Sequence, residues 1–199
     1  DWGYSDAFLR KYDADGNMLW AHQFGLNTSD DFAGGVSVDP SGYVYVAGTT
    51  YGGLPGEIRS EGYNAFLRKY TPSGIEIWTR QFDTGDQDDV EGVEAFGVSA
   101  DPSGNVYVAG ITGGALPGQI HSGDLDVFLR KYDAAGNELW TRQFGSSALE
   151  YGYSVSADPS GNAYVAGYTE GTLPGQTSPG SEDAFLRKYD ADGNELWTR

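Results

Sequence analysis

The chain has 199 residues, of which 29 are acidic and 12 basic, and its net charge is −17. This charge repels a phosphate backbone and an anionic membrane surface, so nucleic acid is not an expected partner. Membrane insertion is not expected either, because no apolar run reaches the roughly 18 residues of a span. Cysteine is absent, which excludes disulfides, thiolate metal sites and cysteine nucleophiles. Thirty glycines and fourteen tyrosines suit short strands joined by tight turns.

Internal repetition organises the whole sequence. The string Phe-Leu-Arg-Lys-Tyr begins at Phe8, Phe66, Phe128 and Phe185, so the copies lie 58, 62 and 57 residues apart. A tryptophan follows each copy with the same spacing, at Trp20, Trp78, Trp140 and Trp197. Two further markers recur in the same register, Asp-Pro-Ser-Gly from Asp39, Asp101 and Asp158, and Leu-Pro-Gly from Leu54, Leu116 and Leu173. Such regular spacing predicts one structural unit per copy.

The first complete unit predicts four strands. The expected strands are residues 35–38, 43–49, 65–70 and 76–82, each with alternating side chains. The turn Asp39-Pro40-Ser41-Gly42 separates the first two, and a longer loop with Leu-Pro-Gly separates the second from the third. Residues 1–24 supply only the last two strands of such a unit.

Four short strands joined in sequence form an antiparallel meander with two apolar faces. Both faces are buried only if copies of the meander stack around an axis. The prediction is therefore an all-β propeller with three complete blades and one half-blade. As a single array over 1–199, it divides into a half-blade at 1–24 and blades at 25–82, 83–144 and 145–199, the last with a truncated fourth strand. The small residues of the first strand place it innermost, with Ser37, Ser99 and Ser156 beside the channel. The repeated Arg-Lys pairs point to opposite strand faces and are expected to be edge charges or partners of carboxylates.

The segments Asp183–Trp197 and Val98–Gly110 carry a resemblance to a known family. They resemble the blades of the bacterial seven-bladed β-propeller repeat family, the SBBP-type repeats. The resemblance implies the propeller fold and an exported protein, extracellular or at the cell surface. A seven-bladed ring needs more blades, so the chain is interpreted as an excerpt of a longer array. Alone it exposes a blade face and strand edges, and we expect self-association.

Two kinds of acidic segment raise the question of calcium. Asp13–Asn17 and Asp190–Asn194 resemble the start of a calcium loop, but the other copies keep the glycine and lose carboxylates, which favours a hairpin turn. The better candidate is the link from Asp83, where Asp86, Asp88, Asp89 and Glu91 could supply several oxygen ligands. The alternative for this link is a solvated acidic loop.

Residues outside the repeat are the remaining candidates for ligand contacts. Trp2, Tyr51 and Tyr63 are expected in loops, where they could contact a sugar. His22 and His121 are interpreted as surface residues. The preferred function is a non-catalytic module for protein or glycan binding or for scaffolding, because variation falls in loops.

The alternative function is a propeller-fold enzyme, a lyase or hydrolase acting on polysaccharide. Such an enzyme should break the repeat symmetry with unique polar residues around one mouth of the channel. The clear asymmetries are the acidic loop near Asp86 and the insertion near Glu94, so the enzyme is the weaker interpretation.

Overall fold

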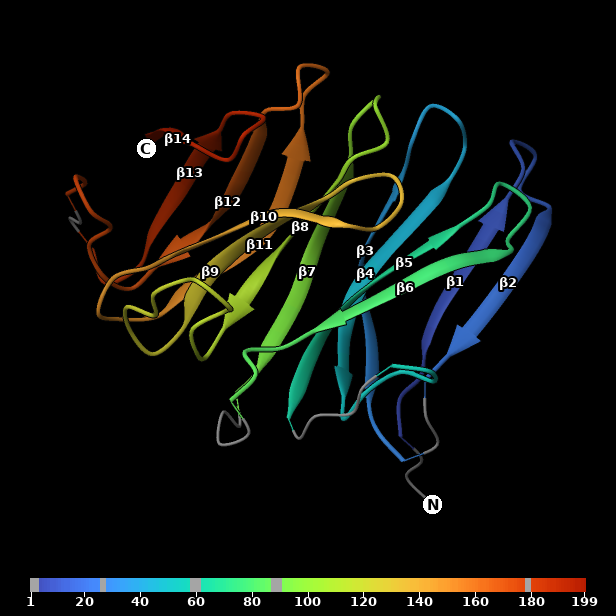
Figure 1. Cartoon of the computed structure of the whole chain (residues 1–199), viewed down its shortest axis with the longest axis horizontal. Helices are drawn as coiled ribbons and strands as arrows, with labels where there is room; N and C mark the ends of the chain where they lie inside the picture. The colour runs from blue at the N-terminus through green and yellow to red at the C-terminus, as the bar shows by residue number, and fades with distance from the viewer. Residues whose placement is uncertain (1–3, 26–27, 58–61, 87–90, 178–179) are drawn as a thin grey trace.

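The structure is a computed structural model that describes residues 4–25, 28–57, 62–86, 91–177 and 180–199. Within those ranges every regular element is a β-strand, and there is no helix long and apolar enough to cross a membrane. Three sheets have four strands and one has two, and they stand side by side in chain order (Figure 1). The all-β blade architecture predicted from the repeat is confirmed, with three complete blades and one half-blade.

The strands of each blade follow one another along the chain. The half-blade consists of β1 (Ala7–Tyr12) and β2 (Met18–Phe24). The first complete blade consists of β3 (Asp31–Val38), β4 (Val44–Tyr51), β5 (Tyr63–Tyr70) and β6 (Glu76–Phe82). The second consists of β7 (Val93–Ala100), β8 (Val106–Thr112), β9 (Asp126–Tyr132) and β10 (Glu138–Phe144). The third consists of β11 (Glu150–Ala157), β12 (Ala163–Thr169), β13 (Asp183–Tyr189) and β14 (Glu195–Thr198). Neighbours pair antiparallel in sequence order, so each blade is a meander.

Aspartate side chains lock the tight turns at one end of each blade. Asp101 Oδ1 accepts hydrogen bonds from the backbone N–H groups of Ser103 at 2.8 Å and Asn105 at 3.0 Å, and Oδ2 accepts one from Asn105 Nδ2 at 2.7 Å. The pattern recurs in the hairpins at Asp13 and Asp190, the segments that resembled a calcium loop. Their carboxylates thus bind their own turn, and these segments are hairpins, as predicted.

The first strand of each blade begins earlier than predicted. In the first complete blade it starts at Asp31 instead of residue 35, because a β-bulge shifts the pairing between Ala33 and Gly35. The extra residue interrupts the two-residue alternation, and the segment before it therefore escaped the prediction. The same bulge lies at Phe96 in β7 and at Tyr153 in β11.

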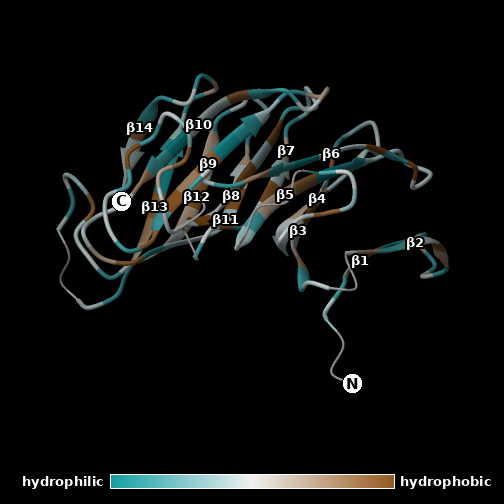
Figure 2. Ribbon diagram, turned by 60° about the horizontal axis from the view of Figure 1, so that its bottom comes forward, coloured by the Kyte–Doolittle hydropathy of each residue, from teal (hydrophilic) through white to brown (hydrophobic). Residues whose placement is uncertain are grey.

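The hydrophobic core lies between blades. One cluster joins the half-blade to β3–β6, a second joins β3–β6 to β7–β10, and a third joins β7–β10 to β11–β14. The apolar residues are concentrated in the middle strands of the sheets (Figure 2). Each sheet therefore buries its apolar faces against its neighbours, which is the physical basis of the stacked arrangement.

The serines of the innermost strands join adjacent blades. Ser37 Oγ accepts a hydrogen bond from the Ala100 backbone N–H, and Ser99 Oγ accepts one from the Ala157 N–H, both at 3.0 Å. These residues were expected beside the channel. The hydroxyls of Ser37 and Ser99 connect one inner strand to the next, the equivalent Ser156 is exposed, and their place beside a channel stays a prediction.

The half-blade and the first two complete blades each hold the next blade through a lysine, a tryptophan and a third side chain, an arginine or a histidine, and we call these three residues the latch. At the last boundary Lys131 Nζ and Trp140 Nε1 donate to the Ala191 carbonyl at 2.9 and 3.1 Å. Arg142 Nε donates to the Gly193 carbonyl at 2.6 Å. The acceptors are thus backbone carbonyls of the β13–β14 hairpin turn.

The other two boundaries repeat the latch. Lysine and tryptophan donate to one turn carbonyl in each case, from Lys69 and Trp78 to Ala134 and from Lys11 and Trp20 to Pro72. Arg80 Nε donates to the Gly136 carbonyl at 2.7 Å. In the half-blade His22 takes this position, with Nε2 2.6 Å from the Gly74 carbonyl oxygen.

The interpretation of His22 as a surface residue was therefore wrong. Its ring stacks on Tyr70, with the ring centroids 5.1 Å apart, and it lies at the blade boundary. Like Arg80 and Arg142, it stands two residues after the repeated tryptophan. That spacing was the signal for its role.

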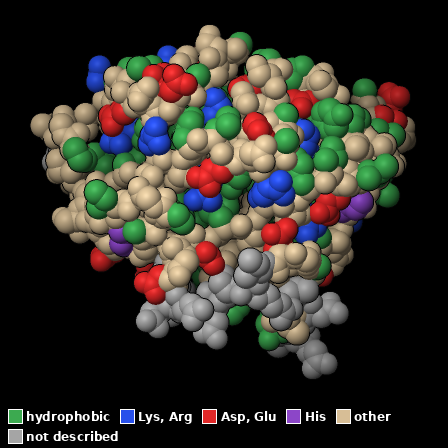
Figure 3. Space-filling view, in the orientation of Figure 1, with side chains coloured by type: hydrophobic (Ala, Val, Ile, Leu, Met, Phe, Trp, Pro, Cys, Tyr) green, Lys and Arg blue, Asp and Glu red, His purple; other side chains and the backbone are tan. Residues whose placement is uncertain are grey.

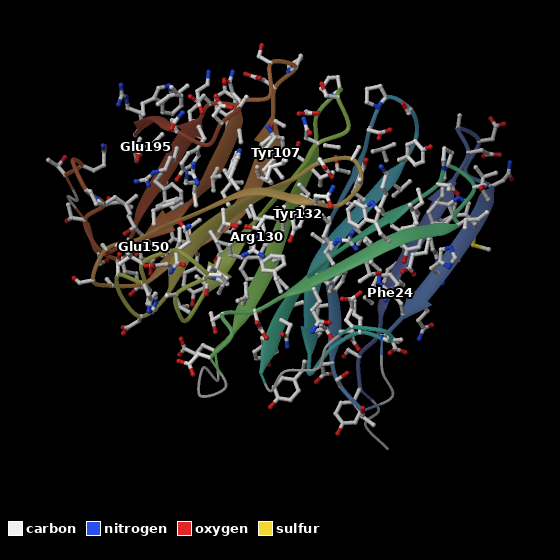
Figure 4. The ribbon with its side chains drawn as sticks, viewed as in Figure 1. Phe24, Tyr107, Arg130, Tyr132, Glu150 and Glu195 are labelled. Carbon is white, nitrogen blue, oxygen red and sulfur yellow. The ribbon has the colours of Figure 1, made fainter. Side chains whose placement is uncertain are left out.

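The Arg-Lys pairs of the first two complete blades are buried at blade boundaries, so for these pairs the prediction of edge charges was wrong. Arg130 points toward the preceding blade, where its guanidinium carbon lies 4.0 Å from the centroid of the Phe82 ring. It also forms an ion pair with Glu138 at 3.5 Å, and it lies beside Tyr132 (Figure 4). Lys131 points to the following blade through the latch. The predicted opposite orientations are confirmed, and the arginine is the member that pairs with a carboxylate.

Candidate binding site at the loop mouth

The two ends of the blades differ in chemistry. One end carries the tight aspartate-locked turns, and in Figure 1 these point upward. The other end carries the links between blades and the long loops between the second and third strands. We call it the loop mouth. The first strand of each blade begins here and the second strand ends here.

Three tyrosines gather at the loop mouth of the third complete blade. Tyr151 lies near the start of β11, and its cross-strand partner is Tyr168, near the end of β12. Their rings stack with centroids 5.0 Å apart and an interplanar angle of 16°. Tyr153, the extra residue of the bulge, lies 5.9 Å from both rings. Phe96 of the preceding blade adds a fourth ring, 5.9 Å from Tyr153. We call these four residues the aromatic cluster.

Carboxylates surround the aromatic cluster. Partial burial raises the pKa of Tyr151, and the charges of Glu170, Glu94 and Glu91 raise it further. Burial also raises the pKa of the Glu94 carboxyl. For Tyr168, partial burial and the neighbouring Tyr153, with which it shares a hydrogen bond, raise the pKa to about 12. Tyr151 and Tyr168 thus remain neutral hydrogen-bonding groups at physiological pH, beside acceptor oxygens.

The aromatic cluster breaks the repeat. The positions of Tyr153 and Tyr168 are occupied by Phe96 and Ile111 in the second complete blade, and by glycine and threonine in the first. Sequence reasoning missed the cluster, because most blade tyrosines recur in register and were assigned to the core. The signal for the cluster is the departure of these positions from the other copies when the repeats are aligned residue by residue.

Of the predicted ligand contacts, two lie at the same mouth. Tyr51 and Tyr63 were expected in loops, but they end β4 and begin β5, where they form a cross-strand pair. Their rings meet edge to face with centroids 5.4 Å apart. The expectation of loops was wrong, because β4 and β5 extend further toward the mouth than the alternation predicts. Trp2 lies outside the described residues.

The structure describes only part of the acidic link. Asp86 and Glu91 are exposed at the loop mouth, whereas Asp88 and Asp89 lie outside the described residues. The Asp86 backbone N–H donates to Thr84 Oγ1 at 3.3 Å, and the Gly85 N–H donates to Asp83 Oδ1 at 3.0 Å. Among the described residues no group of three or more metal-ligating side chains gathers. Calcium binding by this link stays a prediction.

Glu150 lies beside the aromatic cluster as a buried carboxylate that holds the chain at the mouth. Its oxygens accept hydrogen bonds of 2.6 Å from the Ser146 N–H, the Ser146 hydroxyl and the Thr169 hydroxyl. These bonds join the link before β11 to the end of β12. Glu150 therefore fixes the backbone that carries Tyr151 and Tyr168.

Comparisons with known proteins agree with the fold. A family model described as a β-propeller repeat (SBBP) matches residues 19–55 and 139–173. An uncharacterized WD repeat-containing protein, L264 of Acanthamoeba polyphaga mimivirus, is 25% identical over an alignment of 258 residues that covers 98% of this chain and 18% of the relative. The regulatory protein FlaEY of Caulobacter vibrioides is 33% identical over 91 residues, which cover 42% of this chain and 10% of the relative. The chain thus spans less than a fifth of either curated relative.

A solved structure shows the same fold without close sequence similarity. A protein of unknown function from Bacteroides caccae aligns with 96% of this chain and 57% of its own, at a TM-score of 0.50 and 12% identity. At this identity the likeness concerns the fold alone.

Proposed function

Since the chain carries β-propeller repeats of the SBBP family, we propose that it is a non-catalytic binding module that holds a neutral glycan at its loop mouth. The observation that supports this is the aromatic cluster, where three tyrosines of one blade depart from the repeat. Aromatic rings offer apolar faces with a polar tip, and sugar rings present the matching apolar faces and hydroxyls.

The charges around the cluster select the kind of glycan. Glu94 and Glu170 lie close enough to Tyr151 to raise its pKa, and they can accept hydrogen bonds from sugar hydroxyls. Together with the net charge of −17, they disfavour uronic acids and sulfated sugars. The expected ligand is therefore an uncharged oligosaccharide.

The non-catalytic part of the proposal rests on how the unique residues are arranged. The residues that break the repeat here are chiefly aromatic, which favours holding a sugar over cleaving it. An extracellular or cell-surface location is part of the same proposal, since it rests on the resemblance to exported repeats. The alternative, a polysaccharide lyase or hydrolase, would use Glu94 as its reacting carboxylate.

Isothermal titration with neutral and uronic-acid oligosaccharides tests the proposal. We expect a neutral oligosaccharide to bind, and Tyr168→Ala and Tyr153→Ala each to weaken binding about tenfold, which corresponds to ~1.4 kcal/mol. Tyr12→Ala is the matched control, because Tyr12 and Tyr153 are equally exposed, at 50% and 51%, and Tyr12 lies at the opposite end of its strand. Binding that survives both cluster variants, or an absence of binding to every neutral sugar, would contradict the proposal.

A turnover assay on the same sugars separates binding from catalysis. Release of new reducing ends or unsaturated products that stops in Glu94→Gln would replace the proposal with the enzyme. Loss of binding in Tyr51→Ala, with the cluster variants unaffected, would refute the assignment to the aromatic cluster and move the site to the Tyr51–Tyr63 pair.

A further inference from the structure

Two buried carboxylates converge at the loop mouth, where the second complete blade meets the third. Asp126 begins β9 and Glu150 begins β11, and both residues are 0% exposed. A Cβ added at Gly145 would lie against Asp126 Oδ1 and 2.6 Å from Glu150 Oε2. The two oxygens therefore border the same space beside the glycine. They are roughly 4.5 Å apart at most, a span that one Ca²⁺ ion covers with bonds of about 2.3–2.6 Å.

One oxygen of this pair has no hydrogen-bond partner within the described chain. Asp126 Oδ2 accepts hydrogen bonds from the Ser122 backbone N–H at 2.9 Å and from Gln143 Nε2 at 2.8 Å, whereas the buried Oδ1 accepts none. Glu150 Oε2 accepts one bond, from the Ser146 N–H at 2.6 Å, which leaves it a second acceptor position. A buried charged acceptor without a partner destabilises the folded chain. Asp126 Oδ1 is therefore expected to bind a further group.

The pair has no neutralising side chain in the described part of the chain. The ion pairs there are Arg68–Glu76, Arg130–Glu138 and Arg187–Glu195, so none of them includes Asp126 or Glu150. Two like charges removed from water destabilise the folded chain unless a positive charge joins them. A cation bound by both carboxylates offsets the desolvation and the repulsion together.

The same arrangement recurs where the half-blade meets the first complete blade. A Cβ added at Gly25, the counterpart of Gly145, would lie against Asp31 Oδ2 and 2.6 Å from Asp6 Oδ1. Gln23 Nε2 donates to Asp6 Oδ2 at 2.7 Å, as the equivalent glutamine does in the second complete blade. A glycine with two carboxylates beside it is therefore a repeated feature of the loop mouth.

At the boundary between β6 and β7 all three positions change together. Asp83 stands at the position of the glycine, and Asn64 and Val93 stand at the positions of the two carboxylates. One carboxylate remains there, and its Oδ1 accepts a hydrogen bond from the Gly85 N–H at 3.0 Å. Within this chain the two facing carboxylates are thus present together or absent together, which favours a ligand held by both of them.

We propose that the Asp126–Glu150 pair binds Ca²⁺ and that the Asp6–Asp31 pair forms a second site of the same kind. The side chains nearest to Glu150 add only oxygens, since the Ser146 and Thr169 hydroxyls contact it at 2.6 Å. Oxygen ligands select hard cations, and a buried pair suits the flexible coordination of Ca²⁺ better than the hydrated octahedron of Mg²⁺. With two carboxylates for each ion, the expected Kd is about 10⁻⁴–10⁻³ M.

Surface charge concentrates cations at this end of the molecule. Asp86, Glu91 and Glu170 are exposed at the loop mouth, and further acidic side chains are visible over the lower part of the described surface in Figure 3. Together with the net charge of −17, they raise the local concentration of cations beside the two pairs. The acidic link that begins at Asp83 contributes no residue to either pair.

Asp126→Asn separates a cation ligand from a carboxylate with a structural role alone. The asparagine oxygen can keep the two bonds of Oδ2, and its NH₂ group can donate to Glu150 Oε2. Asn64 already occupies the equivalent position in the first complete blade. Without calcium we therefore expect the variant to have a Tm at least as high as the wild type. A structural aspartate would instead make the variant less stable with and without the ion.

Equilibrium dialysis of the chain 1–199 against calcium chloride counts the bound ions. Asp126→Asn and Asp6→Asn should each lower the number of Ca²⁺ ions per chain by one. Asp83→Asn is the matched control and should leave the number unchanged, because Asp83 replaces the glycine at the boundary that lacks the pair. At about 5 mM, calcium chloride should raise the Tm of the wild type more than that of Asp126→Asn, and more than magnesium chloride does.

Three results would overturn the proposal. An unchanged number of ions in Asp126→Asn or Asp6→Asn would remove the corresponding site. Loss of an ion in Asp83→Asn alone would move calcium binding to the acidic link. An equal rise in Tm with magnesium chloride would refute the choice of Ca²⁺. These measurements use no sugar, so they succeed or fail independently of the proposed glycan binding.

Discussion

Replacing Arg142 by alanine measures how much one latch contributes to stability. Arg142 donates to the Gly193 carbonyl at 2.6 Å and to the Asp192 carbonyl at 3.2 Å, both across the blade boundary. A hydrogen bond from a charged donor contributes ~1.5–3 kcal/mol, and less where water can replace it. Because the guanidinium is partly exposed, we expect Arg142→Ala to lower the free energy of unfolding by about 2 kcal/mol. For a chain of this size that corresponds to a fall of roughly 4–8 °C in Tm.

The repeat supplies a matched control for this substitution. Arg199 has the same position in the last blade, but its side chain binds only the Thr198 carbonyl of its own strand within the described chain. In dilute solution, Arg199→Ala should therefore change the free energy of unfolding by less than about 0.5 kcal/mol. Arg142→His should recover part of the loss, since His22 contacts the Gly74 carbonyl from the equivalent position. Urea unfolding followed by tryptophan fluorescence measures the free energy of unfolding of all three variants. Equal losses of stability in Arg142→Ala and Arg199→Ala would refute the reasoning.

Three further predictions concern the blades themselves. Gly110→Ala places a Cβ against the Glu94 carbonyl oxygen and should lower the free energy of unfolding by more than about 3 kcal/mol. Gly118→Ala places its Cβ in open space and should lower it by about 1 kcal/mol. Urea titration of both variants compares the two losses. Asp101→Ala removes the buried acceptor of three turn hydrogen bonds and should lower the free energy of unfolding by ~2–3 kcal/mol in the same assay. Burial and nearby aspartates raise the pKa of Tyr45 and Tyr107 in the folded chain, so as the pH rises the unfolded chain loses these protons first. The free energy of unfolding should therefore fall above pH 10, by up to about 1.4 kcal/mol per pH unit for each tyrosine. Thermal melts at pH 8 to 11 measure this fall in stability.

The sequence predicted the blades because several signals agreed. The period of about 60 residues, the Asp-Pro-Ser-Gly turns and the alternating strands all indicated four-stranded sheets. Stacking followed from the need to bury two apolar faces. The exact start of the inner strand did not follow, since the bulge at Gly34 breaks the alternation on which the prediction rests.

The candidate site could not be predicted from the sequence in the same way. Tyr151 and Tyr168 are 17 residues apart in the chain, and the bulge at Tyr153 shifts the register that brings them opposite each other. A one-residue shift reverses the face on which a strand residue lies. The stacked rings depend on that register, so they became visible only with the pairing of β11 and β12.

The latch explains why one part of the repeat is constant while another varies. Its lysine and tryptophan occur in all four copies, whereas the turn that receives them reads Thr-Pro-Ser-Gly-Ile at 71–75 and Asp-Ala-Ala-Gly-Asn at 133–137. The acceptors are backbone carbonyls, which any residue supplies, so only the donors and the glycine under the tryptophan ring are constrained. The boundary is thus specified mainly from one side and at the turn end of the blade. The loop mouth takes no part in the latch, so its residues can change from blade to blade without weakening the contact between blades. The tyrosines of β11 and β12 lie at this variable end.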